Sequence, residues 1–143
     1  MECELPRVNS NRNEMKKYFE ECKTIAIVGC SPNDTKASNH VAEYLRDAGY
    51  TMIPIYPKGE TILGQKVYRS LAEIDQEVDM VVVFRKPAAL NAIADVVIDR
   101  GDVKVYWTQL ELINNEAADK IKAAGISVVQ NYCAMVEHRE IFA

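Results

Sequence analysis

The chain has 143 residues, of which 48% are hydrophobic, and it carries a formal net charge of −4. This length is typical of one domain with a buried core, and the acidic balance disfavours nucleic-acid binding, which normally relies on a basic face. The longest apolar runs, such as residues 80–84, are shorter than the roughly 20 residues of a membrane span, and residues 1–13 lack a signal-peptide core. We therefore expect a cytoplasmic protein without nucleic-acid or membrane partners.

The first predicted element is an amphipathic helix over residues 11–22, where apolar side chains recur at helical spacing. We expect this helix to pack beside the unit that follows. The predicted organisation is an N-terminal extension with a helix over residues 1–23, and one ligand-binding domain over residues 24–143. A protein partner or a homo-oligomer is left open.

Five short apolar runs follow, and their nearly continuous hydrophobicity is typical of strands that are buried on both faces. They span residues 24–28, 50–55, 79–84, 103–107 and 126–129. Helical patterns around Val41 and Ile93 and over residues 115–124 separate them. Between the second and third runs, residues 59–70 are predicted to form a long loop that carries a short extra strand.

Strands that alternate with helices predict parallel strands joined by right-handed crossovers. The predicted fold class is therefore α/β: a single doubly wound, Rossmann-like domain with a five-stranded, mostly parallel sheet and helices on both faces. We expect the strand order 3-2-1-4-5. Pro54 argues against this order, because proline removes a ladder donor and the order places its strand inside the sheet, unless Pro54 marks the end of the strand.

The turn after the first strand is the first candidate binding element, because open α/β sheets bind ligands beyond the carboxyl ends of their strands. It begins Gly29-Cys30-Ser31. Glycine permits close backbone approach, and the free amides at the start of the next helix attract an anion. Ser38 or Asn39 could donate to a phosphate oxygen, or could serve only as the N-cap of that helix.

Basic residues follow the second and third strands. Lys58 stands where an NAD-binding domain normally places an acidic residue for the ribose, so it suits a ligand with an extra ribose phosphate, such as coenzyme A or NADP. Arg85 and Lys86 precede Pro87 at a predicted helix start, where cations oppose the helix dipole unless an anion is bound. Together with Lys36 they predict a polyanionic small-molecule ligand.

The ends of the last two strands supply groups for the rest of a nucleotide. Trp107 could cover an adenine or a pantetheine chain, or could serve only the core, and Gln109 supplies an amide. The complete set of predicted ligand-binding residues is Gly29, Cys30, Ser31, Lys36, Ser38, Asn39, Tyr56, Pro57, Lys58, Phe84, Arg85, Lys86, Trp107 and Gln109.

We predict no catalytic residues, because neither His40 nor His138 has a recognisable partner. Cys30 and Cys133 are the credible nucleophiles, and each could instead be a small packed residue. No metal site is expected, since the four cysteines form no Cys-x-x-Cys pair and have no neighbouring histidine.

At these residues the sequence resembles the small stand-alone CoA-binding protein family, which is similar to the CoA-binding domain of the succinyl-CoA synthetase α subunit. The resemblance covers about residues 24–133. The matching segments are residues 27–31, 38–41, 49–50, 54–57, 63–64, 78–79, 83–85 and 107–109, with Cys133. Glu111 stands where the family usually has glycine.

The resemblance implies that the glycine turn, with Ser38 and Asn39, holds a pyrophosphate, that Lys58 and Arg85 lie near the nucleotide phosphates, and that Trp107 and Gln109 border the site. It also implies ligand binding without an established reaction. The expected function is therefore binding of coenzyme A or a small acyl-CoA as the cofactor. Two alternatives stay open: an NADP-binding oxidoreductase or redox sensor, and thiol exchange with coenzyme A through Cys30 or Cys133.

Overall fold

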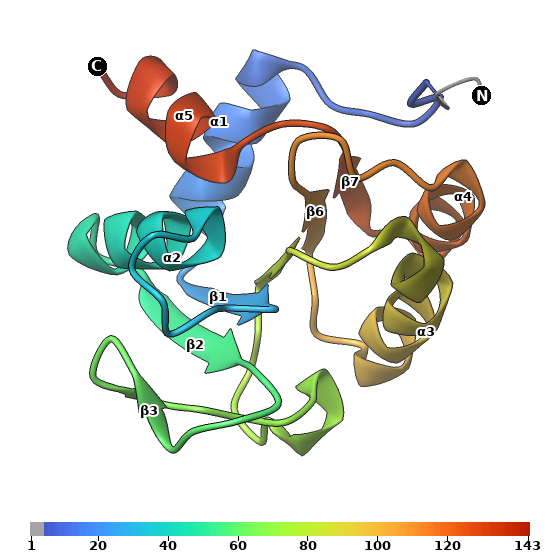
Figure 1. Cartoon of the computed structure of the whole chain (residues 1–143). Helices are drawn as coiled ribbons and strands as arrows, with labels where there is room; N and C mark the ends of the chain where they lie inside the picture. The colour runs from blue at the N-terminus through green and yellow to red at the C-terminus, as the bar shows by residue number, and fades with distance from the viewer. Residues whose placement is uncertain (1–4) are drawn as a thin grey trace.

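A parallel five-stranded sheet forms the centre of the computed structural model, which describes residues 5–143 (Figure 1). Its strands are β1 (Thr24–Val28), β2 (Thr51–Ile55), β5 (Met80–Val83), β6 (Val105–Thr108) and β7 (Ser127–Val129). They pair in the order β2-β1-β5-β6-β7, with every pairing parallel. The predicted fold class is confirmed.

The predicted strand order is wrong, because β2 lies at the edge of the sheet and β1 beside β5. Counted along the chain, the five strands are arranged 2-1-3-4-5. Pro54 explains the difference. Its carbonyl accepts a hydrogen bond from Tyr68 N at 3.0 Å on the outer side of β2, whereas Thr51 N donates inward to Lys23 O at 2.9 Å. The nitrogen of Pro54 therefore faces the outer edge of the sheet. Its lack of an N–H removes no hydrogen bond between β2 and β1.

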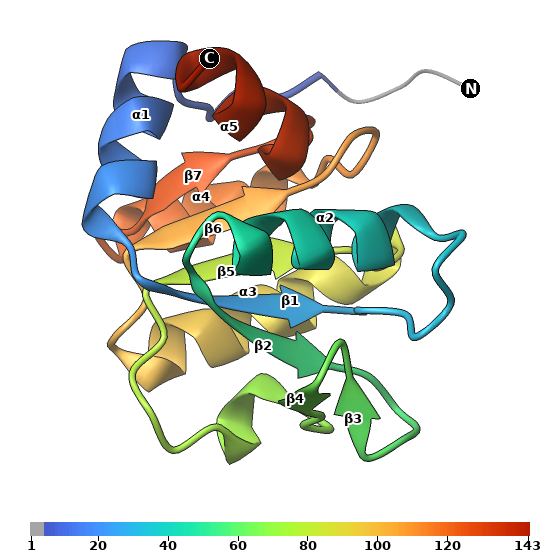
Figure 2. The ribbon, with the colours of Figure 1, turned by 90° about the vertical axis from the view of Figure 1, so that its left-hand side faces the viewer.

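Helices cover both faces of the sheet (Figures 1 and 2). On one face lie α1 (Arg12–Glu21), α2 (Ala37–Asp47) and α5 (Ala134–Ile141). On the other lie α3 (Leu90–Arg100), which continues a 3-10 turn at Pro87–Ala89, and α4 (Asn115–Ala123). Among residues 5–143, no helix combines the length and the apolar character needed to cross a membrane.

Two short strands and a further 3-10 turn lie between β2 and β5. Strands β3 (Thr61–Ile62) and β4 (Gln65–Lys66) form an antiparallel hairpin, and Leu71–Glu73 form the turn. The predicted loop with one extra strand is therefore a hairpin, and Tyr68 beyond it pairs with Ile55 at the end of β2.

The core consists of two layers, because the strands are buried on both faces. Ile25 and Ile27 of β1 point into the layer beneath α1, α2 and α5, whereas Ala26 and Val28 point into the layer beneath α3 and α4. This alternation explains why the sequence of β1 is apolar without interruption. The chain leaves β1 toward α2 on one face and leaves β5 toward α3 on the other, and this divergence makes a crevice at their carboxyl ends.

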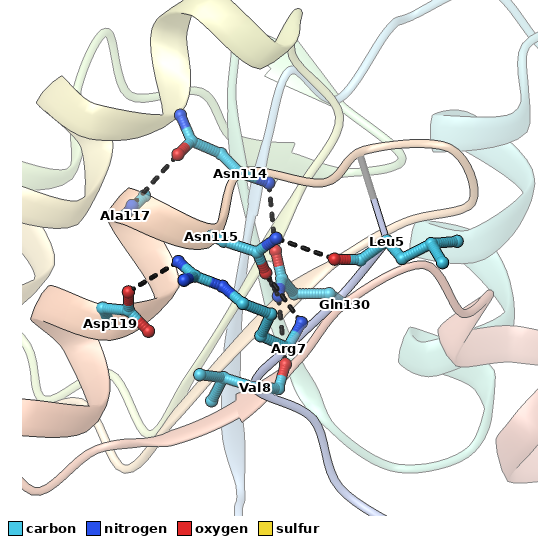
Figure 3. Close-up of polar contacts among 8 residues, drawn as sticks. All are labelled: Leu5, Arg7, Val8, Asn114, Asn115, Ala117, Asp119 and Gln130. Atoms are coloured by element: carbon cyan, nitrogen blue, oxygen red, sulfur yellow. Dashed lines mark hydrogen bonds and ion pairs between the residues drawn. The ribbon is translucent and has the colours of Figure 1, made fainter. Parts of the chain in front are cut away.

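The N-terminal segment of residues 5–10 lies against the end of β7 and the start of α4 (Figure 3). Gln130 is completely buried, and its Nε2 donates to Val8 O at 3.0 Å while its Oε1 accepts from Asn114 N at 3.0 Å. Asn115 Oδ1 accepts from Arg7 N at 2.8 Å. Gln130 thereby connects the N-terminal segment to the loop that precedes α4.

His138 on α5 is surrounded by aromatic rings, including those of Phe19 at 5.0 Å and Phe142 at 4.6 Å between centroids. Its Nδ1 contacts the Tyr44 hydroxyl at 2.8 Å. Burial lowers the pKa of His138 below its ordinary value. The folded state therefore holds this imidazole neutral more strongly than the unfolded state does.

We expect the free energy of unfolding to fall as the pH is lowered from 7 through the ordinary histidine pKa of about 6.5, because the unfolded state then binds the proton more readily. The measurement is urea denaturation at several pH values between 5 and 7. His138→Gln should remove most of this slope. Tyr44→Phe should keep the slope, because the cause of the shift is burial. An unchanged slope in His138→Gln would contradict this assignment.

Candidate nucleotide-binding site

Gly29 at the end of β1 is confined by its own backbone geometry and by the neighbouring strand. Its φ is +85°, and the amides of Gly29 and Cys30 both donate to Ile55 O, at 3.0 and 3.1 Å. A Cβ at this position would stand 2.3 Å from Phe84 O. Because Gly29 has no Cβ, the turn can lie against the carbonyl of Phe84 at the end of β5.

The following turn is held by the two polar residues that were predicted as a helix cap. Ser38 Oγ accepts from Ser31 N at 3.0 Å, and Asn39 Nδ2 donates to Ser31 O at 2.9 Å. Both side chains are more than nine-tenths buried. The predicted N-cap is wrong, because α2 begins at Ala37 after Lys36. Ser38 and Asn39 instead fix the shape of the turn from inside the first turn of the helix.

The N-terminus of α2 carries no negatively charged side chain. Its N-cap residue, the exposed Lys36, forms no side-chain capping hydrogen bond, and the first turn contains no acidic residue. Backbone amides at such a terminus carry partial positive charge. Lys36 adds a full positive charge beside them.

A cleft of about 610 Å³ lies beside this helix, at the carboxyl ends of β5 and β6. It is lined by residues 84–87, residues 109–112, Ala37, Val41 and Cys133. Phe84 is half-buried, whereas Arg85 and Lys86 are exposed. The structure thus brings Phe84, Arg85, Lys86 and Gln109 of the predicted set to one cleft, with the start of α2 in its wall.

Gln109 presents a buried polar side chain in the wall of this cleft. Its side chain is only 4% exposed, and its Oε1 accepts from Ala134 N at 3.4 Å. Its buried Nε2 has no hydrogen-bond partner within the described part of the chain. Since an unpaired buried donor costs about 1–3 kcal/mol, this amide is suited to a ligand that supplies an acceptor.

Arg69 organises the loop that carries Lys58, and it is not among the residues predicted from the sequence. Its guanidinium donates to Tyr56 O at 3.1 Å and to Gly59 O at 2.8 Å. Pro57 and Lys58 are exposed on this loop. Arg69 follows no long strand, so only the pairing of Tyr68 with β2 brings it to the same sheet edge.

A second cavity, of about 290 Å³, lies on the α3 face of the same edge. Both Arg69 and Arg85 line it, and most of its other lining residues are apolar. Because Arg85 also lines the larger cleft, it stands between the two cavities. An elongated ligand could therefore occupy both.

Trp107 and Cys30 are buried in the core, away from the surface of the cleft. Trp107 is completely buried. Its indole donates to Tyr132 O at 2.8 Å and is tilted by 38° against the ring of Phe19, with the two centroids 5.2 Å apart. This contradicts the expectation that it borders the site. Cys30 is also completely buried, and burial raises the pKa of its thiol to about 12. Of the two alternatives for Cys30, a nucleophile or a small packed residue, the structure therefore supports the packed residue.

Glu111 has a left-handed backbone on the rim of the cleft, with φ at +68°. Its N–H donates to Asn131 Oδ1 at 2.7 Å, which ties this loop to the end of β7. A non-glycine residue in this conformation carries a steric cost. Glycine adopts this conformation without that cost, which explains why the CoA-binding family that the sequence resembles usually has glycine here.

We expect Glu111→Gly to raise the free energy of unfolding by up to about 1 kcal/mol, because glycine relieves the left-handed strain at this position. Chemical denaturation measures the change. The matched control is Glu60→Gly, an exposed loop glutamate without a positive φ, which should gain nothing. If Glu111→Gly lowers the free energy of unfolding as much as Glu60→Gly does, Glu111 is not strained.

Some known proteins are similar in sequence to this chain along most of the length of the chain. Residues 23–139 match a family described as CoA binding domain. The uncharacterized protein YneT of Bacillus subtilis is 36% identical over 130 residues, which cover 91% of this chain and 96% of that protein. A hypothetical protein of Pyrococcus horikoshii has a solved structure that matches with a TM-score of 0.90 at 34% identity, with 100% of both chains covered.

A similarity to a larger enzyme is confined to part of this chain. The ADP-forming acetate–CoA ligase of Methanocaldococcus jannaschii is 31% identical over 67 residues. These residues are 47% of this chain and 10% of that enzyme. The similarity therefore concerns a small part of the ligase.

Proposed function

Because this chain belongs to the CoA-binding domain family, we propose that it binds coenzyme A or a small acyl-CoA at the carboxyl edge of its sheet. The observation that carries this proposal is the buried Nε2 of Gln109, which has no partner among residues 5–143 and lies in a cleft beside the N-terminus of α2. One end of the cleft is suited to phosphates, and the other offers an amide donor between apolar side chains.

The proposed arrangement follows the charges along the sheet edge. The pyrophosphate contacts the turn at Gly29 and the amides that begin α2, with Arg85 and Lys86 as counter-charges. The pantetheine arm lies along the larger cleft, where Gln109 donates to one of its amide carbonyls and Leu112 packs against its chain. The adenosine occupies the second cavity, on the other side of Arg85.

Lys58 provides the proposed counter-charge for the ribose phosphate. It is exposed on the loop held by Arg69, beside the end of β1. A 2′-phosphate of NADP would satisfy the same lysine, so Lys58 alone does not separate the two ligands. The apolar cleft with one buried amide donor favours pantetheine, which has amide groups on a largely apolar chain.

The test is a thermal-shift and calorimetric titration with coenzyme A, dephospho-coenzyme A and NADPH. A ligand that binds the native state raises the melting temperature, so we expect a saturable shift with coenzyme A and a smaller one with dephospho-coenzyme A. Absence of a shift at millimolar coenzyme A would refute the proposal. Tighter binding of NADPH than of coenzyme A would replace it with the NADP alternative.

Arg85→Ala is expected to weaken coenzyme A binding roughly 10- to 100-fold, because a charge-assisted contact contributes about 1.5–3 kcal/mol. Its free energy of unfolding should stay within about 0.5 kcal/mol, since Arg85 is exposed. Lys58→Glu should also weaken binding of coenzyme A, and should affect dephospho-coenzyme A much less. Calorimetry measures both effects.

The matched control is Lys23→Ala, which removes an exposed lysine at the opposite end of β1. Its affinity for coenzyme A should equal that of the unmodified chain. An equal loss of affinity in Lys23→Ala would indicate general charge attraction in place of contacts at the site. A matching loss of stability in Arg85→Ala would show that Arg85 is structural.

A further inference from the structure

Cys133 is the accessible thiol among the described residues. Cys22 and Cys30 belong to the core and are 3% and 0% exposed, and burial raises the pKa of each to about 12. Cys133 is only partly buried, is not in a disulfide, and lines the larger cleft. Cys3 lies outside the described residues.

The surroundings of Cys133 independently point to a ligand. Cys133 is the N-cap residue of α5, and the amide of the next residue, Ala134, donates to Gln109 Oε1 at 3.4 Å. The Gln109 side chain, whose Nε2 is buried and unpaired, therefore lies directly beside the start of α5.

The order of the strands gives the direction in which the proposed ligand extends. The groups suited to phosphates follow β1 and β5, Gln109 follows β6, and Cys133 follows β7, the next strand in the sheet. Neighbouring strands are about 4.8 Å apart, so this series advances steadily across the edge. A coenzyme A molecule with its phosphates at Arg85 and its amides at Gln109 therefore directs its sulfur toward Cys133.

We propose that Cys133 forms a reversible mixed disulfide with coenzyme A. This inference rests on the proposed function, and its co-reactant is coenzyme A disulfide. The Cys133 thiolate attacks one sulfur of that disulfide, the bond between the two coenzyme A sulfurs breaks, and a bond from Cys133 Sγ to one coenzyme A forms. The second coenzyme A leaves as a thiolate, and a free thiol reverses the step.

Such an exchange would make the chain responsive to the oxidation state of coenzyme A. When the disulfide is present, one coenzyme A is held covalently in the cleft; when free thiols predominate, the same site binds coenzyme A reversibly. The bound nucleotide accelerates the exchange because it raises the local concentration of the reacting sulfur.

The experiment incubates the full chain with coenzyme A disulfide and, separately, with pantethine, which has the same disulfide without the nucleotide. Intact-mass spectrometry follows the rate, and peptide mapping locates the adduct. We expect one coenzyme A on Cys133, formed at least about 10-fold faster than the pantethine adduct. Arg85→Ala should remove this advantage, and Cys133→Ser should prevent the adduct while it still shows a thermal shift with coenzyme A. A Cys3→Ser variant should react like the unmodified chain.

Equal rates with the two disulfides would show an ordinary exposed thiol and would overturn the inference. An adduct on Cys3 alone would do the same. Thermal-shift binding of coenzyme A without any adduct on Cys133 would overturn the inference and leave the proposed function in place. If coenzyme A produces no thermal shift, the proposed function itself fails, and the mixed disulfide fails with it.

Discussion

Gly29→Ala is expected to lower the free energy of unfolding by about 2–5 kcal/mol and to impair binding at the sheet edge. Two costs combine. A left-handed backbone costs a residue with a Cβ about 1–2 kcal/mol, and forcing an extra carbon into a packed site costs about 1–3 kcal/mol. The new Cβ would lie 2.3 Å from Phe84 O, a backbone atom that cannot rotate away. Chemical denaturation measures the loss.

Gly59→Ala is the matched control for this substitution. Gly59 has nearly the same φ, +84°, but no atom of the described residues lies within 4 Å of the position that its Cβ would take. It should therefore lose only the conformational part, about 1–2 kcal/mol. Equal losses in the two variants would show that contact with the end of β5 contributes nothing.

Ligand binding should respond to Gly29→Ala more than stability alone predicts. Relief of the clash requires β1 and β5 to separate where the turn begins, and this moves the residues after both strands. We expect calorimetry at a temperature where the variant is folded to show a loss of coenzyme A affinity. The control for affinity is Gly125→Ala, at the opposite end of the sheet with a φ of +84°, which should show no such loss. Unaltered affinity in folded Gly29→Ala would argue that the ligand lies elsewhere.

Trp107→Ala is expected to lower the free energy of unfolding by about 3–5 kcal/mol, as truncation of a buried aromatic side chain typically does. Trp107 is completely buried beside Phe19, so the substitution leaves a large cavity between β6 and α1. It also removes the donor to Tyr132 O. Thermal or chemical denaturation measures the loss, and Trp107→Phe should lose less because it keeps a ring in place.

Trp107→Phe also separates a role in the core from a role in the site. Since the indole lies away from the cleft surface, the folded variant should bind coenzyme A with an affinity close to that of the unmodified chain. A large loss of affinity with little loss of stability would contradict this placement, and would return Trp107 to the ligand-contact role suggested by its position after a strand.

Local sequence patterns predicted most of the secondary structure, because burial on both faces requires uninterrupted apolar strands. The strand at Thr24–Val28 is predicted to the residue, and the others differ by one or two residues at their ends. Helix α5 was not predicted, since it is only eight residues long and its apolar pattern is short. The strand order was missed because pairing is a long-range property, although Pro54 already indicated an edge strand.

The same division holds for the candidate site. The fold class, the family resemblance and the basic character of the strand ends could be predicted, because they depend on residue type and on position relative to each strand. The positions of the side chains could not be predicted, because they depend on packing between segments that are distant in the chain. Packing of α1 against the sheet buries Trp107, and hydrogen bonds to Ser31 turn Ser38 and Asn39 inward.

Gly29 itself illustrates the physical reason. Its position after a strand predicted that another group lies close to its backbone. The identity of that group, the carbonyl of Phe84 just after β5, could not be predicted, because β5 is distant in the chain. Likewise, the unpaired amide of Gln109 and the accessibility of Cys133 arise from neighbours that meet only in the folded chain. Residue type determines what a group can do chemically, and packing determines which groups a ligand can reach.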